Sequence, residues 1–304
     1  MAKKLTKEQI NKLTNDKRLC KYPWNIESDY GTIITKNVYS WERQAKSFVN
    51  SYIKPYVTGG VKTALSDAKD DDKRRAEEIK NYYGQAWFNL IAKQIETMGF
   101  TIKRSFNQID LENSLQRYVA SVDGYSFASV KMQIGINKVD PIKSDRRLQD
   151  YMHSKIKENV SLIKSMNVKY AHDLENDIYR SINEGGGISA ITKKITERTQ
   201  MNVRHAKLIA TDQTGKILGQ MNAYRSKKAG AEKYIWTSMG DNRVRPAHRT
   251  LNETVQKYDD PDGGDNGQMP GEPINCRCIA VAIFEGLNFE GLDFDEDSGR
   301  DDAV

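Results

Sequence analysis

Cysteine is scarce in this 304-residue chain, which contains only Cys20, Cys276 and Cys278. Cys276 and Cys278 are separated by one residue, a spacing too short for an ordinary unstrained disulfide bond. This usage excludes the disulfide-stapled scaffold of small secreted domains. It leaves open thiolate chemistry at the Cys276 and Cys278 pair.

The chain also lacks a long apolar run. No stretch reaches the roughly 18 consecutive apolar residues that a membrane-spanning helix needs. The amino-terminal sequence MAKKLTKEQINKLTNDKR opens with basic residues but has no apolar core of the kind that a secretory signal contains. We therefore expect a soluble protein that is made and used in the cytoplasm and has no membrane partner.

Positive and negative charges are unevenly distributed along the chain. Residues 285–304 contain eight acidic side chains and a single basic one, Arg300, and we expect this acidic tail to be flexible. The whole chain carries +6, so residues 1–284 carry +13 once the tail's −7 is set aside. A surplus of this size attracts nucleic acid or an acidic protein partner, although a solvated lysine-rich surface would show the same composition.

Long stretches of the sequence follow a helical period. Residues 72–98 contain no proline and place apolar side chains at steps of three and four, which predicts a long amphipathic helix that ends near Gly99. A second helical block opens at Asp145 and stops at the glycine run 185–187. Beyond it we predict a helix from Ser189 to about Thr199 and a longer one over 203–228.

Two other regions differ from this helical pattern. Residues 125–139, YSFASVKMQIGINKV, are rich in β-branched and aromatic types, which favours a short strand or hairpin. Residues 232–284 read as strand, loop and strand, with a turn-rich insert of Gly, Asp, Asn and Pro between the two strands. An insert as long as the one between these two strands usually has a function, a ligand or disorder to account for it.

These patterns define the expected fold class and domains. We predict a mostly α-helical protein with a small α+β domain at its carboxyl end, in which long amphipathic helices precede a short-stranded, turn-rich unit. The expected divisions are a helical region over 1–140, a second domain over 141–284 with helices in 145–228, and the tail 285–304.

The turn-rich insert contains candidate metal ligands. If Cys276 and Cys278 enter the following strand, their side chains point to the same face. His248 lies on the other arm of the insert, and two thiolates with an imidazole are ligands that zinc prefers. Asp241, another carboxylate or water could complete the site. The alternative is that the cysteines are buried as apolar groups and the histidine is a hydrogen-bonded structural residue.

A catalytic interpretation competes with the metal site. Asp241 and His248, with arginines at positions 243, 245 and 249, are groups that a metal-dependent nuclease could use. However, Asp241-Asn242 is a common turn pair, and no second acidic cluster accompanies it. We therefore expect a protein that is not an enzyme.

At these residues the chain resembles the phage Mu F-like minor head proteins, also called the phage head morphogenesis family. The resemblance rests on four segments in order, and it covers roughly residues 145–290. They are HAKLIATDQTGKILGQMNAYRSKKAG, EKYIW, DNRVRPAHRTLNE and PGEPINCRC.

The resemblance implies a non-enzymatic component of the virion of a tailed double-stranded DNA phage. Such a protein would act in head morphogenesis and in DNA packaging or ejection. It would lie inside the head near the portal and would be present in the host cytoplasm during assembly. The implied partners are the portal protein, double-stranded DNA, and the scaffold or major capsid protein. A DNA-binding protein without a portal partner is the alternative.

Relatives of this kind often carry a second histidine or further cysteines around the matching positions, so the resemblance also implies metal binding. This chain departs from that form, because Arg245 and Ile274 stand where such ligands are expected. In addition, Asn252-Glu253 replaces the more usual Leu-Asp/Asn-Gly ending. We therefore do not expect a closed four-ligand site, and His248, Cys276, Cys278 and Asp241 remain the candidate ligands, with zinc as the candidate ion.

Overall fold

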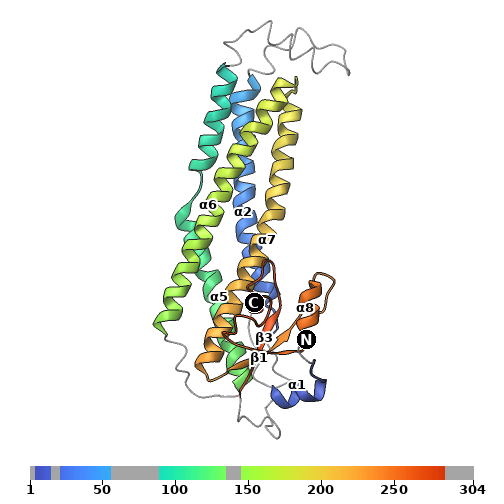
Figure 1. Ribbon diagram of the computed structural model, residues 1–304. Helices are drawn as coiled ribbons and strands as arrows, with labels where there is room; N and C mark the ends of the chain where they lie inside the picture. The colour runs from blue at the N-terminus through green and yellow to red at the C-terminus, as the bar shows by residue number, and fades with distance from the viewer. Residues whose placement is uncertain (1–3, 15–20, 56–88, 135–144, 285–304) are drawn as a thin grey trace. The chain divides into compact units, whose positions relative to one another are not determined.

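The computed structural model describes residues 4–14, 21–55, 89–134 and 145–284 (Figure 1). Most of these residues are helical, and a small antiparallel sheet lies near the carboxyl end of the sequence, which confirms the predicted fold class. Among the described residues, no helix is both long and apolar enough to cross a membrane. Cys20 and the acidic tail lie outside the described residues.

The chain forms two compact units, each assembled from separate segments. The sheet unit contains Met1–Trp24, Ala120–Asp150 and Thr211–Val304. The helical unit contains Asn25–Val119 and Tyr151–Ala210.

The helical unit is built from rows of buried apolar residues on long helices. Its elements are α2 (Trp24–Phe48), the π-helix η2 (Val49–Ile53), helical residues 89–104, and parts of α5 (Gln108–Ile134), α6 (Arg146–Asn183) and α7 (Ile188–Lys228). Many apolar residues of the second predicted helical block are buried in α6, including Ile163, Leu174 and Ile178. The helical period therefore identified the side of α6 that enters the core.

Two predicted helix ends are wrong. Residues 72–88 of the first predicted helix lie outside the described residues, but helix 89–104 continues past Gly99. A Cβ on Gly99 would lie 1.5 Å from the Glu175 carboxylate, so glycine here makes room for a neighbouring side chain and does not end the helix. The break predicted between 199 and 203 is absent from α7, because Thr199 is buried and hydrogen bonded to Tyr170 at 3.1 Å.

The hairpin predicted over 125–139 is also wrong, since residues up to Ile134 belong to α5 and 135–139 lie outside the described residues. Tertiary packing overrides the β propensity of this segment. Ser126 accepts a 2.7 Å hydrogen bond from the buried Arg225 of α7. The Gln133 side chain accepts a 3.0 Å hydrogen bond from the backbone N–H of Ala282, in an edge strand of the sheet.

The sheet has the order β2-β1-β3, and β1 pairs antiparallel with both neighbours. Its strands are β1 (Lys233–Thr237), β2 (Val255–Lys257) and β3 (Ile279–Ile283). The two predicted strands are confirmed, whereas β2 was missed because it is only three residues long.

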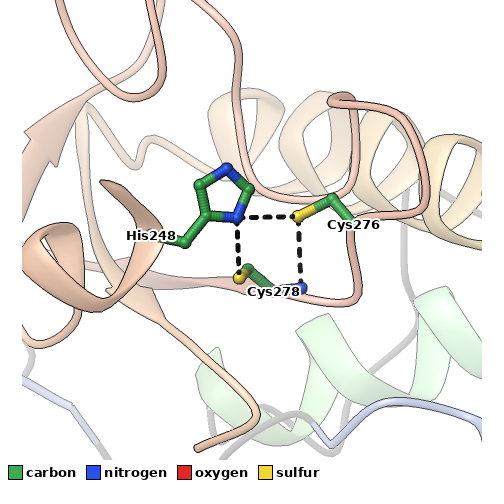
Figure 2. A group of neighbouring side chains, drawn as sticks. All are labelled: His248, Cys276 and Cys278. Atoms are coloured by element: carbon green, nitrogen blue, oxygen red, sulfur yellow. Dashed lines mark hydrogen bonds between the residues drawn. The ribbon is translucent and has the colours of Figure 1, made fainter. Parts of the chain in front are cut away.

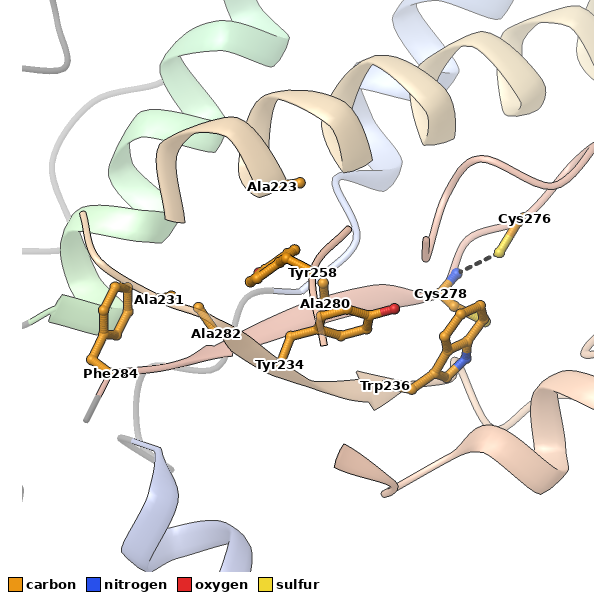
Figure 3. Packing of buried hydrophobic residues seen from close by; sticks show 10 residues of the cluster. All are labelled: Ala223, Ala231, Tyr234, Trp236, Tyr258, Cys276, Cys278, Ala280, Ala282 and Phe284. Atoms are coloured by element: carbon orange, nitrogen blue, oxygen red, sulfur yellow. Dashed lines mark hydrogen bonds between the residues drawn. The ribbon is translucent and has the colours of Figure 1, made fainter. Parts of the chain in front are cut away.

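Side chains alternate between the two faces of the sheet, as a strand period of two requires. One face contributes Tyr234, Trp236, Ala280 and Ala282 to a cluster that includes Ala223 of α7 (Figure 3). The opposite face is covered by Leu5 and by helix α1 (Lys7–Leu13). The residues of that second cluster are Ile235, Val281 and Ile283, with Leu5, Ile10, Leu13 and Val255 packed against them.

Candidate metal centre

Local structure brings the two arms of the insert together. His248 lies on the short helix α8 (Pro246–Leu251), which begins with a proline whose missing N–H is not needed at that position. Cys276 and Cys278 lie at the end of the insert, immediately before β3. Because β3 pairs directly with β1, the end of the insert returns to its beginning.

The three side chains form one buried group (Figure 2). His248 Nδ1 lies 3.6 Å from Cys276 Sγ and 3.5 Å from Cys278 Sγ, and all the ligand atoms lie within 4.8 Å of one another. Tetrahedral zinc, with bonds of about 2.3 Å to sulfur and 2.0 Å to nitrogen, places such ligands about 3.5 Å apart. The donor types and their spacing therefore fit a metal ion such as zinc.

Hydrogen bonds prepare Cys276 to carry a negative charge. Its Sγ accepts the backbone N–H groups of Gly271 and Cys278, each at 3.4 Å. A hydrogen bond from the Cys278 thiol and these backbone donors lower the pKa of Cys276 to about 6. The same pairing, together with burial, raises the pKa of Cys278.

The structure brings three of the four predicted ligands together and places Asp241 elsewhere. The Asp241 carboxylate accepts hydrogen bonds from Arg243 Nε at 3.0 Å and Nη2 at 2.5 Å, which lowers its pKa. Among the described residues, the buried group contains only His248, Cys276 and Cys278.

Two residues around the cluster were missed by sequence reasoning. Asp265 lies 3.0 Å from His248 Nε2, and the Trp236 ring meets the imidazole edge to face, with centroids 5.1 Å apart. Asp265 belongs to the sequence Asp-Asn-Gly, which indicates a turn but no ligand partner. Arg245 and Ile274, the two residues that depart from the family pattern, contact each other, because the Arg245 guanidinium donates a hydrogen bond to the Ile274 carbonyl.

Glycines allow the cysteine loop to approach α7 at backbone distance. A Cβ on Gly215 would lie 2.3 Å from the Cys276 carbonyl oxygen, and one on Gly219 would lie 2.4 Å from that of Pro270. Gly271 has φ +95, and a Cβ on it would lie 2.4 Å from the Gly215 carbonyl oxygen. The spacing of glycines in TGKILGQ was the available sequence signal, because glycines four apart share one helix face.

Polar contacts also join the cysteine loop to the part of α7 that begins at Thr211. Asn275 N–H donates to Asp212 at 3.0 Å, and Arg277 donates to Thr211 at 2.7 Å. The Arg277 guanidinium also lies 4.7 Å from the ring centroid of Trp24. The His248, Cys276 and Cys278 cluster is therefore held between α7, the sheet and the amino-terminal segment of the sheet unit.

Comparisons with known proteins agree with the motifs. Residues 172–281, which include the whole cluster, match the family described as Phage Mu protein F like protein. An uncharacterized protein of Haemophilus influenzae is 24% identical over 178 residues, which cover 57% of this chain and 39% of that protein. Minor head protein GP7 of Bacillus phage SPP1 is 21% identical over 287 residues, which cover 90% of this chain and 88% of that protein.

No solved structure matches the chain significantly. The family match covers the segments that carried the resemblance in the sequence, from the second half of α6 to β3. The relationship to the SPP1 protein extends over most of the chain. The chain therefore contains a Phage Mu F-like domain and is a distant homologue of a phage minor head protein, which confirms the family resemblance of its motifs.

Proposed function

We propose that this protein is a minor head protein of a tailed double-stranded DNA phage that acts inside the head near the portal. The observation that carries the proposal is the similarity to a minor head protein along 90% of this chain. The proposed roles are head morphogenesis and the packaging or ejection of DNA. The proposed partners are the portal protein, and the scaffold or major capsid protein during assembly.

Association with the portal can be tested by co-expressing the full chain with the portal protein of the same phage. Size-exclusion chromatography should give a shared peak, and mass spectrometry of purified virions should detect the chain. Separate peaks, with the chain absent from virions, would overturn the proposal. Separate peaks with DNA binding retained would favour a DNA-binding protein without a portal partner.

DNA binding is supported by an arginine-rich strip on the sheet unit, defined by Lys4, Arg243, Arg245, Arg249 and Arg277. Lys4 donates to the Arg249 carbonyl at 3.1 Å, and Arg249 donates to the Asn242 carbonyl at 3.4 Å. Arg243 and Arg277 both lie against the Trp24 ring, at 5.1 and 4.7 Å from its centroid. These contacts place Lys4 beside Arg249, and Arg243 and Arg277 beside the same tryptophan.

Two arginines of the strip donate hydrogen bonds to neutral groups. Asp241 pairs with Arg243, whereas the hydrogen bonds described for the Arg245 and Arg249 guanidiniums go to backbone carbonyls. Exposed guanidiniums of this kind bind phosphate oxygens with little sequence preference.

We expect the full chain to bind duplex DNA with an affinity that falls steeply between about 50 and 200 mM salt. The double variant Arg245→Gln, Arg249→Gln should bind more weakly and with a shallower salt slope. The matched control Lys157→Gln, Lys164→Gln removes the same charge from exposed positions of α6 and should bind as the native chain does. Absence of binding at low salt would remove the DNA role.

We further propose that the His248, Cys276 and Cys278 cluster binds zinc and closes the fold of the insert. The support is the burial of all three donors and spacings that match tetrahedral zinc. Elemental analysis of protein purified without chelator should find about one equivalent of zinc per chain. Protein that contains negligible zinc and takes up none on addition would contradict this proposal.

A non-enzymatic role is also part of the proposal. The rival is a metal-dependent nuclease that uses His248 and Asp241, but Asp241 is engaged by Arg243 and His248 by the thiols and Asp265. Plasmid DNA should stay intact with Mg²⁺, Mn²⁺ or Zn²⁺. Nicking that is lost in His248→Ala would overturn the non-enzymatic assignment.

A further inference from the structure

The imidazole of His248 has a different partner on each nitrogen. Nδ1 faces the two sulfur atoms (Figure 2), and it lies 3.6 Å from Cys276 Sγ and 3.5 Å from Cys278 Sγ. Nε2 lies 3.0 Å from the Asp265 carboxylate, on the far side of the ring. His248 is buried, with an exposed fraction of 2%, so its hydrogen bonds are made with the protein.

The identity of these partners selects one tautomer of the ring. An ionised carboxylate only accepts hydrogen bonds, so Nε2 must carry the hydrogen that is donated to Asp265. In the neutral ring, Nδ1 then has a free lone pair directed toward Cys276 and Cys278. This is the tautomer that can donate an electron pair to a metal between Nδ1 and the sulfurs.

Asp265 is held in place by its own backbone. Its N–H donates to the Gln268 carbonyl at 3.0 Å, and Gln268 N–H donates back at 3.1 Å. Asn266 and Gly267 between them have φ values of 54 and 80, the left-handed pair of a type I′ turn. Gly264 N–H also donates to the Gln256 side chain at 3.0 Å, which ties this turn to β2. The carboxylate is therefore presented from a closed turn.

We propose that Asp265 is a positioning residue of the metal site, which orients His248 and makes the turn 265–268 part of the zinc centre. The inference rests on the proposed zinc binding. A carboxylate that accepts the second N–H of a ligating histidine fixes the ring and raises its basicity, and loss of such a partner typically weakens metal binding about 10- to 100-fold.

Zinc affinity of the full chain, measured by competition with a chromophoric chelator, tests the proposal. Asp265→Ala should raise the zinc dissociation constant about 10- to 100-fold. Asp265→Asn should cause a smaller loss, because its amide oxygen still accepts the Nε2 hydrogen without the negative charge. The matched controls Asp262→Ala and Asp262→Asn change an exposed carboxylate of the same loop and should leave the affinity unchanged.

Cobalt substitution gives a readout that separates positioning from general stability. The sulfur-to-cobalt charge-transfer band should keep the native shape in Asp265→Asn, because both thiolates are intact, but should appear at higher cobalt concentration. The metal-free forms of Asp265→Asn and Asp262→Asn should unfold at similar temperatures. If Asp265→Ala does not fold, the comparison of these two asparagine variants still decides the question.

Failure of the zinc proposal can be distinguished from failure of the role of Asp265. A native chain that binds no zinc contradicts the zinc proposal and the positioning role with it. A native chain that binds zinc, with equal affinity in the folded Asp265 and Asp262 variants, leaves the zinc proposal intact and overturns the role of Asp265.

Discussion

The helical unit and the sheet unit are stabilised by different kinds of contact. In the helical unit, buried residues such as Ile34, Ile163 and Leu174 repeat along long helices, so many similar contacts each contribute a small part of the folding free energy. In the sheet unit, a few specific contacts recur instead: glycines against a loop, a buried histidine and cysteine cluster, and tight turns. A repeated apolar stripe therefore tolerates local change, whereas a unit of short strands depends on single residues.

Removal of the proposed zinc ion should have the largest effect and should distinguish the two units. A strong chelator should lower the thermal midpoint of the sheet unit by about 10 °C or more, because a structural metal contributes folding free energy directly. Hydrogen exchange should accelerate in β1, α8 and β3 but not in Tyr151–Ala210 of the helical unit. Equal acceleration in both units would remove the distinction between them.

The next largest effect should come from adding one methyl group to a glycine of α7. Gly215→Ala forces a Cβ to 2.3 Å from the Cys276 carbonyl, so we expect a loss of about 1–3 kcal/mol and weaker zinc binding. Gly124→Ala is the matched control, because its Cβ would meet no atom within 4 Å in the interior of α5. That variant should be more stable by about 0.5–1 kcal/mol in chemical denaturation.

A polar contact of the helical unit should matter less. Arg198 of α7 contacts Asp173 at 2.9 Å and Asp177 at 2.6 Å, and all three side chains are partly exposed. Arg198→Ala should therefore cost about 1 kcal/mol and leave zinc affinity unchanged. Coupling of this variant to zinc binding would show that the two units depend on each other.

Stability of the sheet unit should also depend on pH through Asp145. Hydrogen bonds from Lys228 and Tyr224 lower the pKa of this carboxyl, so its stabilising effect is complete above the unfolded value of about 4 and is lost as pH falls toward the lower folded value. Asp145→Asn should therefore be less stable than the native chain at pH 7. The difference between the two should shrink below about pH 4, as thermal unfolding at several pH values can measure.

The smallest expected effect is a gain. Glu253 has φ 65, its side chain is exposed, and its backbone groups bond to Trp236 and Leu5. Glycine adopts this conformation freely, at the cost of a more flexible unfolded chain. Glu253→Gly should therefore stabilise the sheet unit by about 0.5 kcal/mol, seen as a rise in its denaturation midpoint. A loss of stability would mean that the Glu253 side chain makes a favourable contact.

The long helices could be predicted from the sequence because their information is local. Leu148, Val160 and Ile163 lie on the buried face of α6, and Asp145 caps its start through a 2.8 Å bond from Arg147 N–H. The predicted helix ends were wrong where the role of a residue depended on a neighbour that is distant in the sequence. Gly99 looked like a helix end but makes room for Glu175.

The candidate site was predicted in part for the same reason. The residue types of His248, Cys276 and Cys278 and the two-residue spacing of the cysteines were sufficient to nominate three ligands. Asp241 was nominated by proximity in sequence, but the nearby Arg243 engages it. Asp265 was missed because its partner, His248, is brought to it only by the closure of the insert.

The helical period, the strands β1 and β3, the family motifs and the three candidate metal ligands of the insert could be predicted from the sequence alone. Only the tertiary structure decided that the residues 125–134 are helical, that Gly215 and Gly219 receive the cysteine loop, and that Asp265 meets His248. The physical reason is the separation along the chain over which each interaction acts. Propensity and periodicity act between residues a few positions apart, whereas close backbone approach and side-chain pairing join segments that are distant in the chain.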